Sequence, residues 1–299
     1  GGGIAGITTA LELLETGGHD VMILDRDTRE RFGGLARWSF GGIFFVDTPQ
    51  QRFMGIDDSP ELALRDWKSF AEFGANDDWP KRWAEQYVHR CTDDVYRWLR
   101  ERGIHFFPVV HWVERGLFEP GNSVPRFHMV WGTGRELTTT LIDRLRTHEN
   151  ADRLTCRFRH HVTDLERSGG HISGVQGVNE RTDDPFQVEA EHVVIAAGGI
   201  CGDIERLKQH WSPDWGAPPE TILNGSHRYA DGDLHDEAAE HGANVTHLDK
   251  QWLYAAGVEH PDPEGKPYDA LRVVPPKSAL WVNHRGERIG PPPLVSGFD

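Results

Sequence analysis

The sequence predicts an α/β fold whose parallel sheet begins at a nucleotide-binding loop, and three consecutive observations carry this prediction. Residues 1–6 read Gly-Gly-Gly-Ile-Ala-Gly, which is the pattern G-x-G-x-x-G. Residues 7–16 follow with apolar side chains at helical spacing, namely Ile7, Ala10, Leu11 and Leu14. After two glycines that stop the helix, residues 20–25 read as a buried strand that ends on Asp25.

Each glycine of the opening loop has a predicted task in a Rossmann-like dinucleotide site. Gly1 permits the tight turn, and Gly3 lets the backbone approach a pyrophosphate that the helix N-terminus stabilises. Gly6 permits close packing of helix against strand. The pattern alone also fits an ordinary glycine-rich turn followed by a surface Asp. Loop, helix, strand and acid arrive here in the required order, which favours the nucleotide site.

Asp25 narrows the class of nucleotide. It lies 25 − 6 = 19 positions after Gly6, close to the offset of about 20 residues expected for a contact with the ribose hydroxyls. A carboxylate accepts hydrogen bonds from a diol and repels a 2′-phosphate, so Asp25 favours FAD or NAD over NADP. The loop normally follows a strand, and none precedes Gly1. We therefore expect the chain to begin just after the first strand of its sheet.

The remaining elements are predicted in chain order. Residues 60–102 are expected to be helical, with Pro60 in a first turn and a second helix starting at Thr92. Leu137 to Leu145 is predicted to be a short helix. Residues 154–165, 174–178 and 188–197 are predicted to be strands, the first two joined by a turn at residues 168–170. A domain change is placed near residue 225, giving a nucleotide-binding domain at 1–225 and a second domain at 226–299, and both are expected to be incomplete.

An irregular aromatic-rich stretch covers residues 104–131. It contains Phe106, Phe107, Trp112, Phe118, Phe127 and Trp131. Such a run is more often core than pocket, and a core is the favoured interpretation. The irregular spacing leaves an apolar substrate wall as the alternative.

Composition excludes several functional classes. With 32 Lys and Arg against 47 Asp and Glu, the formal charge is −15, which opposes a nucleic-acid partner. No apolar stretch of about 18 residues occurs, so no integral membrane segment is expected. The three cysteines, Cys91, Cys156 and Cys201, form no CxxC pair, so neither a metal site nor a disulfide framework is predicted, and a cytoplasmic location is expected.

A second glycine cluster, Gly33-Gly34 and Gly41-Gly42, suggests backbone lying against a large planar ligand. This segment resembles the flavoprotein family of fumarate reductases and succinate dehydrogenases, which includes the 3-ketosteroid dehydrogenases. In that family a G-G-x-[ST]-x-x-x-x-G-G segment packs along the flavin. Ala36 stands where Ser or Thr is usual. No His lies between Arg31 and Gly42, so the resemblance implies non-covalent FAD, with Leu35, Ala36 and Ser39 also at the cofactor.

Further matches follow in the order that the family has them. Val162 resembles the position whose backbone meets the adenine, and Ala196-Ala197-Gly198 resembles the strand end that abuts the FAD. Residues 230–232 are similar to a G-D-G turn before a helix, and residues 281–289 to a hairpin. The resemblance implies a parallel sheet with a small antiparallel crossover sheet, then the start of an α+β cap domain. The implied cofactor-binding residues are Gly1, Gly3, Gly6, Asp25, Arg26, Gly33, Gly34, Leu35, Ala36, Ser39, Gly41, Gly42, Val162, Ala196, Ala197, Gly198 and Asp231.

The implied reaction is hydride transfer between flavin and a carbon adjacent to a carbonyl, on a ketosteroid-like or dicarboxylate-like substrate. The candidates for proton exchange are His227, Tyr229, Arg126 and His128, and each also fits a surface or structural role. The expected partners are a small-molecule substrate and an electron acceptor or donor.

Three alternatives remain open at the level of sequence. A flavin amine oxidase or desaturase shares the first loop but usually has Arg after the second glycine pair, where Leu35 stands here. A non-catalytic flavin-binding module is disfavoured by the acidic balance. A second nucleotide loop at residues 198–202 has the wrong spacing. Nothing after Gly290 resembles the family's closing FAD segment, so we expect the chain alone to bind FAD poorly.

Overall fold

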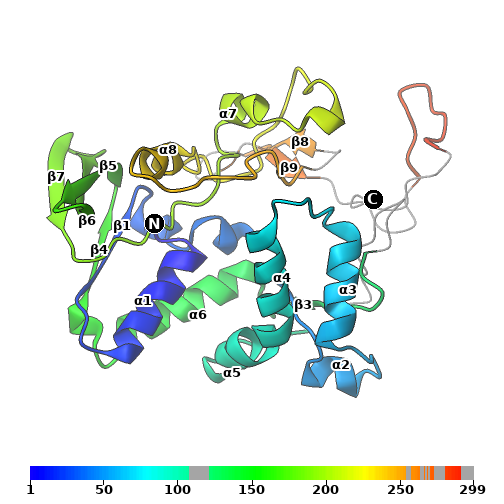
Figure 1. Ribbon diagram of the computed structural model, residues 1–299, viewed down its shortest axis with the longest axis horizontal. Coiled ribbons are helices and arrows are strands. Elements are labelled where there is room, and N and C mark those ends of the chain that lie inside the picture. Colours follow the sequence, from blue (N-terminus) through cyan, green and yellow to red (C-terminus); the bar gives the residue numbers. More distant parts are fainter. Residues whose placement is uncertain are drawn as a thin grey trace. The chain divides into compact units, whose positions relative to one another are not determined.

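A computed structural model of the chain describes residues 1–107, 121–253, 257–262, 266, 268, 270–272 and 280–290 (Figure 1). The predicted aromatic positions Trp112 and Phe118 lie outside these residues. The chain divides into two compact units. Unit 1 comprises residues 1–38, 141–253 and 257–272, and unit 2 comprises residues 39–140, 254–256 and 273–299.

Unit 1 opens with the predicted helix and strand. Helix α1 (Ile4–Thr16) buries Ile7, Ala10, Leu11 and Leu14, the face that the periodicity predicted. Gly17 ends the helix with φ of 75°, a conformation that glycine adopts without a steric penalty. Strand β1 (Val21–Asp25) pairs in parallel with β4 (Leu154–Phe158), Asp25 lying opposite Phe158. The expected loop, helix and parallel strand are therefore present.

An antiparallel sheet follows in unit 1, in the order β5-β6-β7. Its strands are β5 (His160–Ser168), β6 (His171–Asn179) and β7 (Asp184–Glu189). Gly169 and Gly170, both with positive φ, form the two-residue turn between β5 and β6, a turn type that requires left-handed backbone. Helices α7 (Ile204–Gln209) and α8 (Asp233–Glu240) complete this part, with a short hairpin of β8 (Gly257–Glu259) and β9 (Ala270–Arg272).

The predicted strand at 188–197 is only partly correct. Residues 188 and 189 end β7, whereas residues 192–199 run without strand pairing to any described residue. A strand needs a neighbouring backbone, and apolar composition alone does not supply one. Val194 and Ile195 consequently remain exposed.

Unit 2 contains a two-stranded antiparallel sheet, β2 (Gly42–Phe44) with β3 (Phe127–Met129), and a helical part. The helices are α2 (Pro49–Phe53), α3 (Pro60–Phe70), α4 (Asp78–Arg90) and α5 (Trp98–Glu101), with a π-helical segment, Cys91–Arg97, between α4 and α5. Helices α3 and α4 lie side by side (Figure 1). Helix α6 (Thr133–Thr147) begins in unit 2 and ends in unit 1.

The helix start predicted at Thr92 is wrong, because helical backbone runs from α4 through Cys91–Arg97 into α5. The break lies at residues 71–77 instead. The Thr92 hydroxyl does not cap a helix; it donates to the carbonyl oxygen of Val46. A polar residue that resembles an N-cap in the sequence is thus used for a tertiary contact.

Aromatic rings form the core of unit 2. Phe45, Tyr96, Phe106 and His128 contact one another, with ring centroids 5.2–6.1 Å apart. The core interpretation therefore holds for Phe106, whereas Trp131 is 60% exposed.

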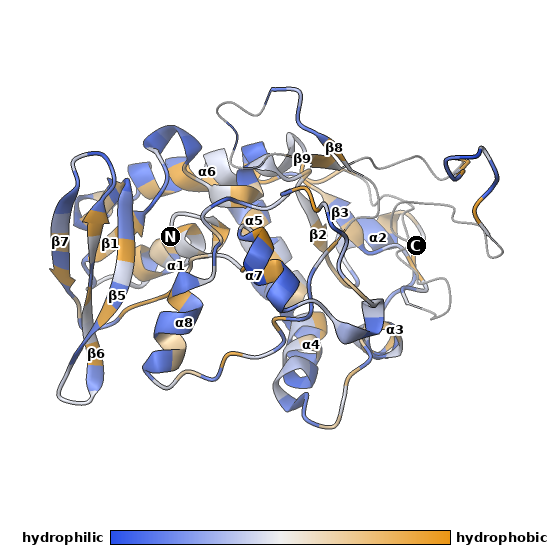
Figure 2. Cartoon of the chain, turned by 90° about the horizontal axis from the view of Figure 1, so that it is seen from above, coloured by the Kyte–Doolittle hydropathy of each residue, from blue (hydrophilic) through white to orange (hydrophobic). Residues whose placement is uncertain are grey.

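Hydropathy varies around single helices such as α7, whose residues are largely hydrophilic while Leu207 is buried (Figure 2). Across the described ranges, no helix has the length and apolarity that a membrane span requires.

Candidate functional site

The opening glycine loop is closely packed at two positions and open at the third. A Cβ on Gly1 would overlap the carbonyl oxygen of Ala196, and one on Gly6 would overlap that of Gly1. A Cβ on Gly3 would meet no described atom within 4 Å. Gly1 and Gly6 are therefore required by the fold itself, whereas Gly3 faces space that a ligand can enter.

The N-terminus of α1 is available to an anion. Gly3 occupies the N-cap position, and no side chain of the described residues caps the helix there. The first turn therefore keeps unpaired backbone N–H groups beside the open position at Gly3. These groups and the helix dipole together form a site suited to a pyrophosphate.

Asp25 lies at the end of β1 and faces the loop. One carboxylate oxygen accepts a hydrogen bond from the backbone N–H of Gly2, and the other accepts from that of Asp27 at 2.7 Å. Each oxygen of an ionised carboxylate accepts two hydrogen bonds, so both keep capacity for a ribose hydroxyl. The geometry suits the ribose contact that the spacing predicted.

Gly33 and Gly34 lie directly on the opening loop. The N–H of Gly33 donates to the carbonyl of Gly2 at 2.9 Å. A Cβ on Gly34, whose φ is 56°, would be 3.0 Å from the Cα of Gly3. Leu35 and Ala36 follow in a helical turn, Gly34–Trp38. The structure thus brings together, within unit 1, the opening glycine loop and the pair Gly33-Gly34, which are about thirty residues apart in sequence.

Trp38 ends this turn and carries an unused hydrogen-bond donor. Its indole nitrogen is buried and has no hydrogen-bond partner among the residues that the structure describes. The ring lies against Tyr268, with centroids 6.0 Å apart, and the ammonium of Lys266 is 4.7 Å from its centroid. A buried donor without a partner is unusual in a folded chain and suits a ligand acceptor.

Ser39, Gly41 and Gly42 belong to unit 2 and have packing partners there. The Ser39 hydroxyl accepts from Gly41 N–H at 3.1 Å. A Cβ on Gly41 would lie 2.7 Å from the backbone nitrogen of Gly134, and one on Gly42 would overlap the Phe127 ring. Packing within the protein therefore already requires glycine at positions 41 and 42.

The remaining predicted cofactor residues lie in unit 1. Val162 is on β5, Ala196 adjoins Gly1, and Ala197 and Gly198 continue that segment. Arg26 is held by two carboxylates, with Nε 2.8 Å from Glu180 and Nη1 2.8 Å from Asp231. Its guanidinium carbon also lies 4.5 Å from the centroid of the Tyr229 ring. Arg26 and Asp231 therefore contact each other, a pairing that the sequence did not reveal.

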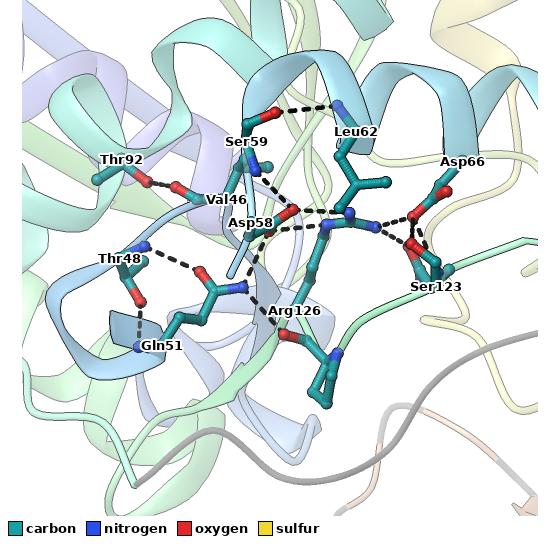
Figure 3. A network of polar contacts seen from close by, with 12 residues as sticks. Val46, Thr48, Gln51, Asp58, Ser59, Leu62, Asp66, Thr92, Ser123 and Arg126 are labelled. Carbon is teal, nitrogen blue, oxygen red and sulfur yellow. Dashed lines mark hydrogen bonds and ion pairs between the residues drawn. The ribbon is translucent and has the colours of Figure 1, made fainter. Parts of the chain in front are cut away.

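Two proton-exchange candidates, Arg126 and His128, are buried in unit 2. Figure 3 shows the contacts of Arg126 with Asp58 and Asp66. Arg126 binds Asp58 through two parallel hydrogen bonds of 2.9 and 2.7 Å, and Asp66 through one of 2.7 Å. Burial lowers the pKa of Arg126, but the two carboxylates outweigh burial and raise it above its usual value. Asp58 and Asp66 were not among the predicted site residues, because no local motif marks them.

His128 is fully buried and neutral. Its Nδ1 lies 2.8 Å from the Arg126 carbonyl oxygen, which only accepts, so Nδ1 carries the proton. Nε2 then accepts from the Thr48 hydroxyl at 2.8 Å. Burial lowers the pKa of His128 to about 4, against the smaller opposing effects of the Arg126 carbonyl and the Asp58 charge.

The other two candidates, His227 and Tyr229, lie in unit 1 near the end of β1. His227 Nε2 is 3.2 Å from a carboxylate oxygen of Asp27. The Tyr229 ring is 5.6 Å from the His227 ring, and the phenolic oxygen has no hydrogen bond to a described residue. The structure thus separates the four candidates into one pair in each unit.

Comparison with known proteins places this geometry in a family. The FAD binding domain family matches residues 1–290. The chain belongs to this family. FAD is therefore its cofactor, as the second glycine cluster predicted, and the open position at Gly3, the uncapped helix and Asp25 fit that molecule.

Two curated relatives are similar over the whole chain. A KsdD-like steroid dehydrogenase of Mycolicibacterium smegmatis is 39% identical over 318 residues, covering 100% of this chain and 57% of that protein. One of Mycobacterium tuberculosis is 41% identical and is covered to 55%. The chain therefore spans somewhat more than half the length of the curated relatives it matches.

Solved structures confirm the predicted fold class. A 3-ketosteroid-Δ4-(5α)-dehydrogenase of Rhodococcus jostii matches with a TM-score of 0.68 at 22% identity, over 99% of this chain and 61% of that one. A flavocytochrome c3 fumarate reductase matches with a TM-score of 0.69 at 22% identity, over 91% of this chain and 43% of that one. Together with the family match, these likenesses confirm the predicted resemblance.

Proposed function

We propose that this protein is an FAD-dependent oxidoreductase that dehydrogenates or reduces a carbon–carbon bond next to a carbonyl group. One observation carries the proposal: the chain is 39% and 41% identical over its whole length to KsdD-like steroid dehydrogenases. That likeness favours a ketosteroid-like substrate over a dicarboxylate.

In this proposal the residues of unit 1 hold the cofactor. The N–H groups of α1 bind the pyrophosphate beside Gly3, and Asp25 binds the ribose hydroxyls. Gly33 and Gly34 keep the backbone flat against the opening loop, and Val162, the segment 196–198 and Asp231 contribute further contacts. When bound, FAD supplies the hydride chemistry. The absence of His between Arg31 and Gly42 supports a non-covalent cofactor.

The protein must also exchange a proton with the substrate, and the contacts favour Tyr229 for this task. Arg126 and His128 have their polar atoms engaged by neighbouring protein groups, which favours a positioning role. His227 faces the buried carboxylate of Asp27. Tyr229 is the one candidate of the four whose side-chain polar atom has no hydrogen bond to a described residue.

The wider setting is proposed on the same basis. We assign FAD binding to a domain at residues 1–225. We assign substrate binding to a cap domain, of which residues 226–299 are the first part. The partners are a small-molecule substrate and an electron acceptor or donor; the charge of −15 disfavours nucleic acid. The three free thiols favour a reducing, cytoplasmic location.

Anaerobic reduction of the FAD-loaded protein tests the reaction and the substrate class together. We expect a saturated 3-ketosteroid to bleach the visible flavin absorbance, while succinate and a primary amine leave it unchanged. Bleaching by succinate would move the substrate class to dicarboxylates. Bleaching by the amine alone would contradict the proposal and favour the amine oxidase alternative.

A further inference from the structure

Three consecutive residues at the end of β1 point their side chains at three different segments of unit 1. Asp25 binds the opening glycine loop, Arg26 binds Glu180 and Asp231, and Asp27 contacts His227. The residues that follow the ribose carboxylate are therefore tied to a segment two hundred positions later in the chain.

That later segment, residues 226–232, is a compact turn. The N–H of Ala230 donates to the carbonyl of His227 at 2.8 Å, and the Ala230 carbonyl accepts from Gly202 N–H at 2.9 Å. A Cβ on Gly202 would overlap the His227 carbonyl. Close packing of this backbone therefore fixes the direction in which the side chains of residues 226–232 point.

The hydrogen bonds of His227 fix its ring proton. Nδ1 accepts from the backbone N–H of Tyr229 at 3.3 Å, so the proton lies on Nε2, the atom that faces Asp27. The ring therefore turns Nε2–H towards Asp27 Oδ2 at 3.2 Å; the contact is not aligned as a hydrogen bond, and that buried oxygen has no hydrogen bond to any described residue.

Asp27 depends on such partners because it is only 4% exposed. Burial by itself raises the pKa of Asp27, but His227, the N–H of Thr28 and the charge of Arg31 outweigh burial and keep that pKa below its usual value. Loss of a partner leaves a buried carboxylate less stable, because its desolvation is no longer offset. The contact with His227 therefore holds residues 25–27 and 226–232 together.

We propose that His227 is a positioning residue for the cofactor: through Asp27 it fastens residues 226–232 to residues 25–27 and so fixes Asp25 for the FAD ribose. Arg26 makes the same connection a second time, through Asp231 and the face of Tyr229. The proposal rests on FAD as the cofactor and does not depend on the reaction proposed above.

The test uses FAD affinity, measured by flavin fluorescence over micromolar to millimolar FAD, and amide hydrogen exchange of residues 226–232 without FAD. We expect His227→Ala to raise the Kd for FAD about tenfold and to speed exchange in that segment. His227→Gln places an amide N–H near the position of Nε2, so we expect a Kd within about threefold of the parent value.

His241→Ala is the matched control. His241 also faces a carboxylate in unit 1, with Nε2 3.1 Å from Glu237, and this pair is more exposed than His227 and Asp27. We expect it to leave the Kd for FAD and the exchange of residues 226–232 unchanged. We expect the double variant Asp27→Asn with His227→Ala to lose no more FAD affinity than the more affected single variant, because both substitutions remove the same contact.

Three results would overturn the proposal. The first is an unchanged Kd in a folded His227→Ala chain, and the second is an equal loss in His241→Ala. The third is a tenfold loss in folded His227→Gln, which keeps the donor; this variant also decides the question if His227→Ala does not fold.

Discussion

Arg126 shows at the scale of one residue how a buried charge is satisfied in this chain. Its side chain and that of Asp58 are 0% exposed, and Asp66 is 7% exposed. Asn122 supplies a further acceptor at 2.9 Å. The guanidinium therefore joins the start of α3 to β3, and it is the positively charged partner of both buried carboxylates.

Removing the guanidinium is expected to be costly. Arg126→Ala leaves Asp58 and Asp66 buried beside each other, and we expect a loss of about 3–5 kcal/mol in the free energy of unfolding, measured by urea denaturation at pH 7. The matched control is Arg146→Ala, whose ion pair with Asp143 is more than half exposed and is expected to contribute little. Equal effects of the two changes would contradict a structural role for the buried triad.

His128 gives the chain a defined response to pH. Its pKa is about 4 in the folded state and 6.5 for a free side chain, so between these values the unfolded state binds the extra proton. Its contribution is therefore fully present above about pH 6.5 and is lost as the pH falls towards 4, by about 3 kcal/mol in total.

The difference between the parent chain and His128→Asn isolates this contribution, because Asn does not titrate and keeps a donor near Nδ1. We expect the stability difference between the two, from urea unfolding, to narrow as the pH is lowered from 7 to 4.5. A difference that is constant over this range would show that His128 is not buried as a neutral ring.

At the scale of elements, the sequence correctly predicted the helices and turns that are determined by residues close together in the chain. The apolar face of α1 and the two-glycine turn before β6 follow from local spacing, and both are found. The strand at 188–197 was only partly correct and the helix start at Thr92 was wrong, because both depend on remote backbone: a pairing strand in one case and the Val46 carbonyl in the other. Hydrophobic pattern carries no information about such partners.

The contact between α1 and the opening loop yields a prediction at this scale. A methyl group on Gly6 would overlap the carbonyl of Gly1, so we expect Gly6→Ala to lower the free energy of unfolding by about 1–3 kcal/mol. Gly74→Ala is the control, since its Cβ would make only ordinary contacts. Thermal and urea unfolding compare the two. An unaffected Gly6→Ala chain would mean that the loop does not pack against its own first residue.

At the scale of the whole molecule, the cofactor was predictable and its surroundings were not. Fixed spacings marked Gly1, Gly3, Gly6 and Asp25, and the family match bears out FAD. No motif marks Asp27 or Glu180, because their partners are up to 200 positions away. Gly41 and Gly42 have two reasons to be glycine. The family pattern relates both to flavin, and in unit 2 neighbouring atoms leave no room for a Cβ at either position.

The affinity of Gly3→Ala for FAD is the most direct measure of a cofactor held at the opening loop. Gly3 has φ of −76°, which alanine adopts readily, and a methyl group there meets no described atom within 4 Å. The substitution is therefore expected to leave thermal unfolding unchanged while raising the Kd for FAD at least tenfold, because the methyl group occupies the approach to the pyrophosphate. An unchanged Kd in the folded variant would contradict FAD binding at this loop.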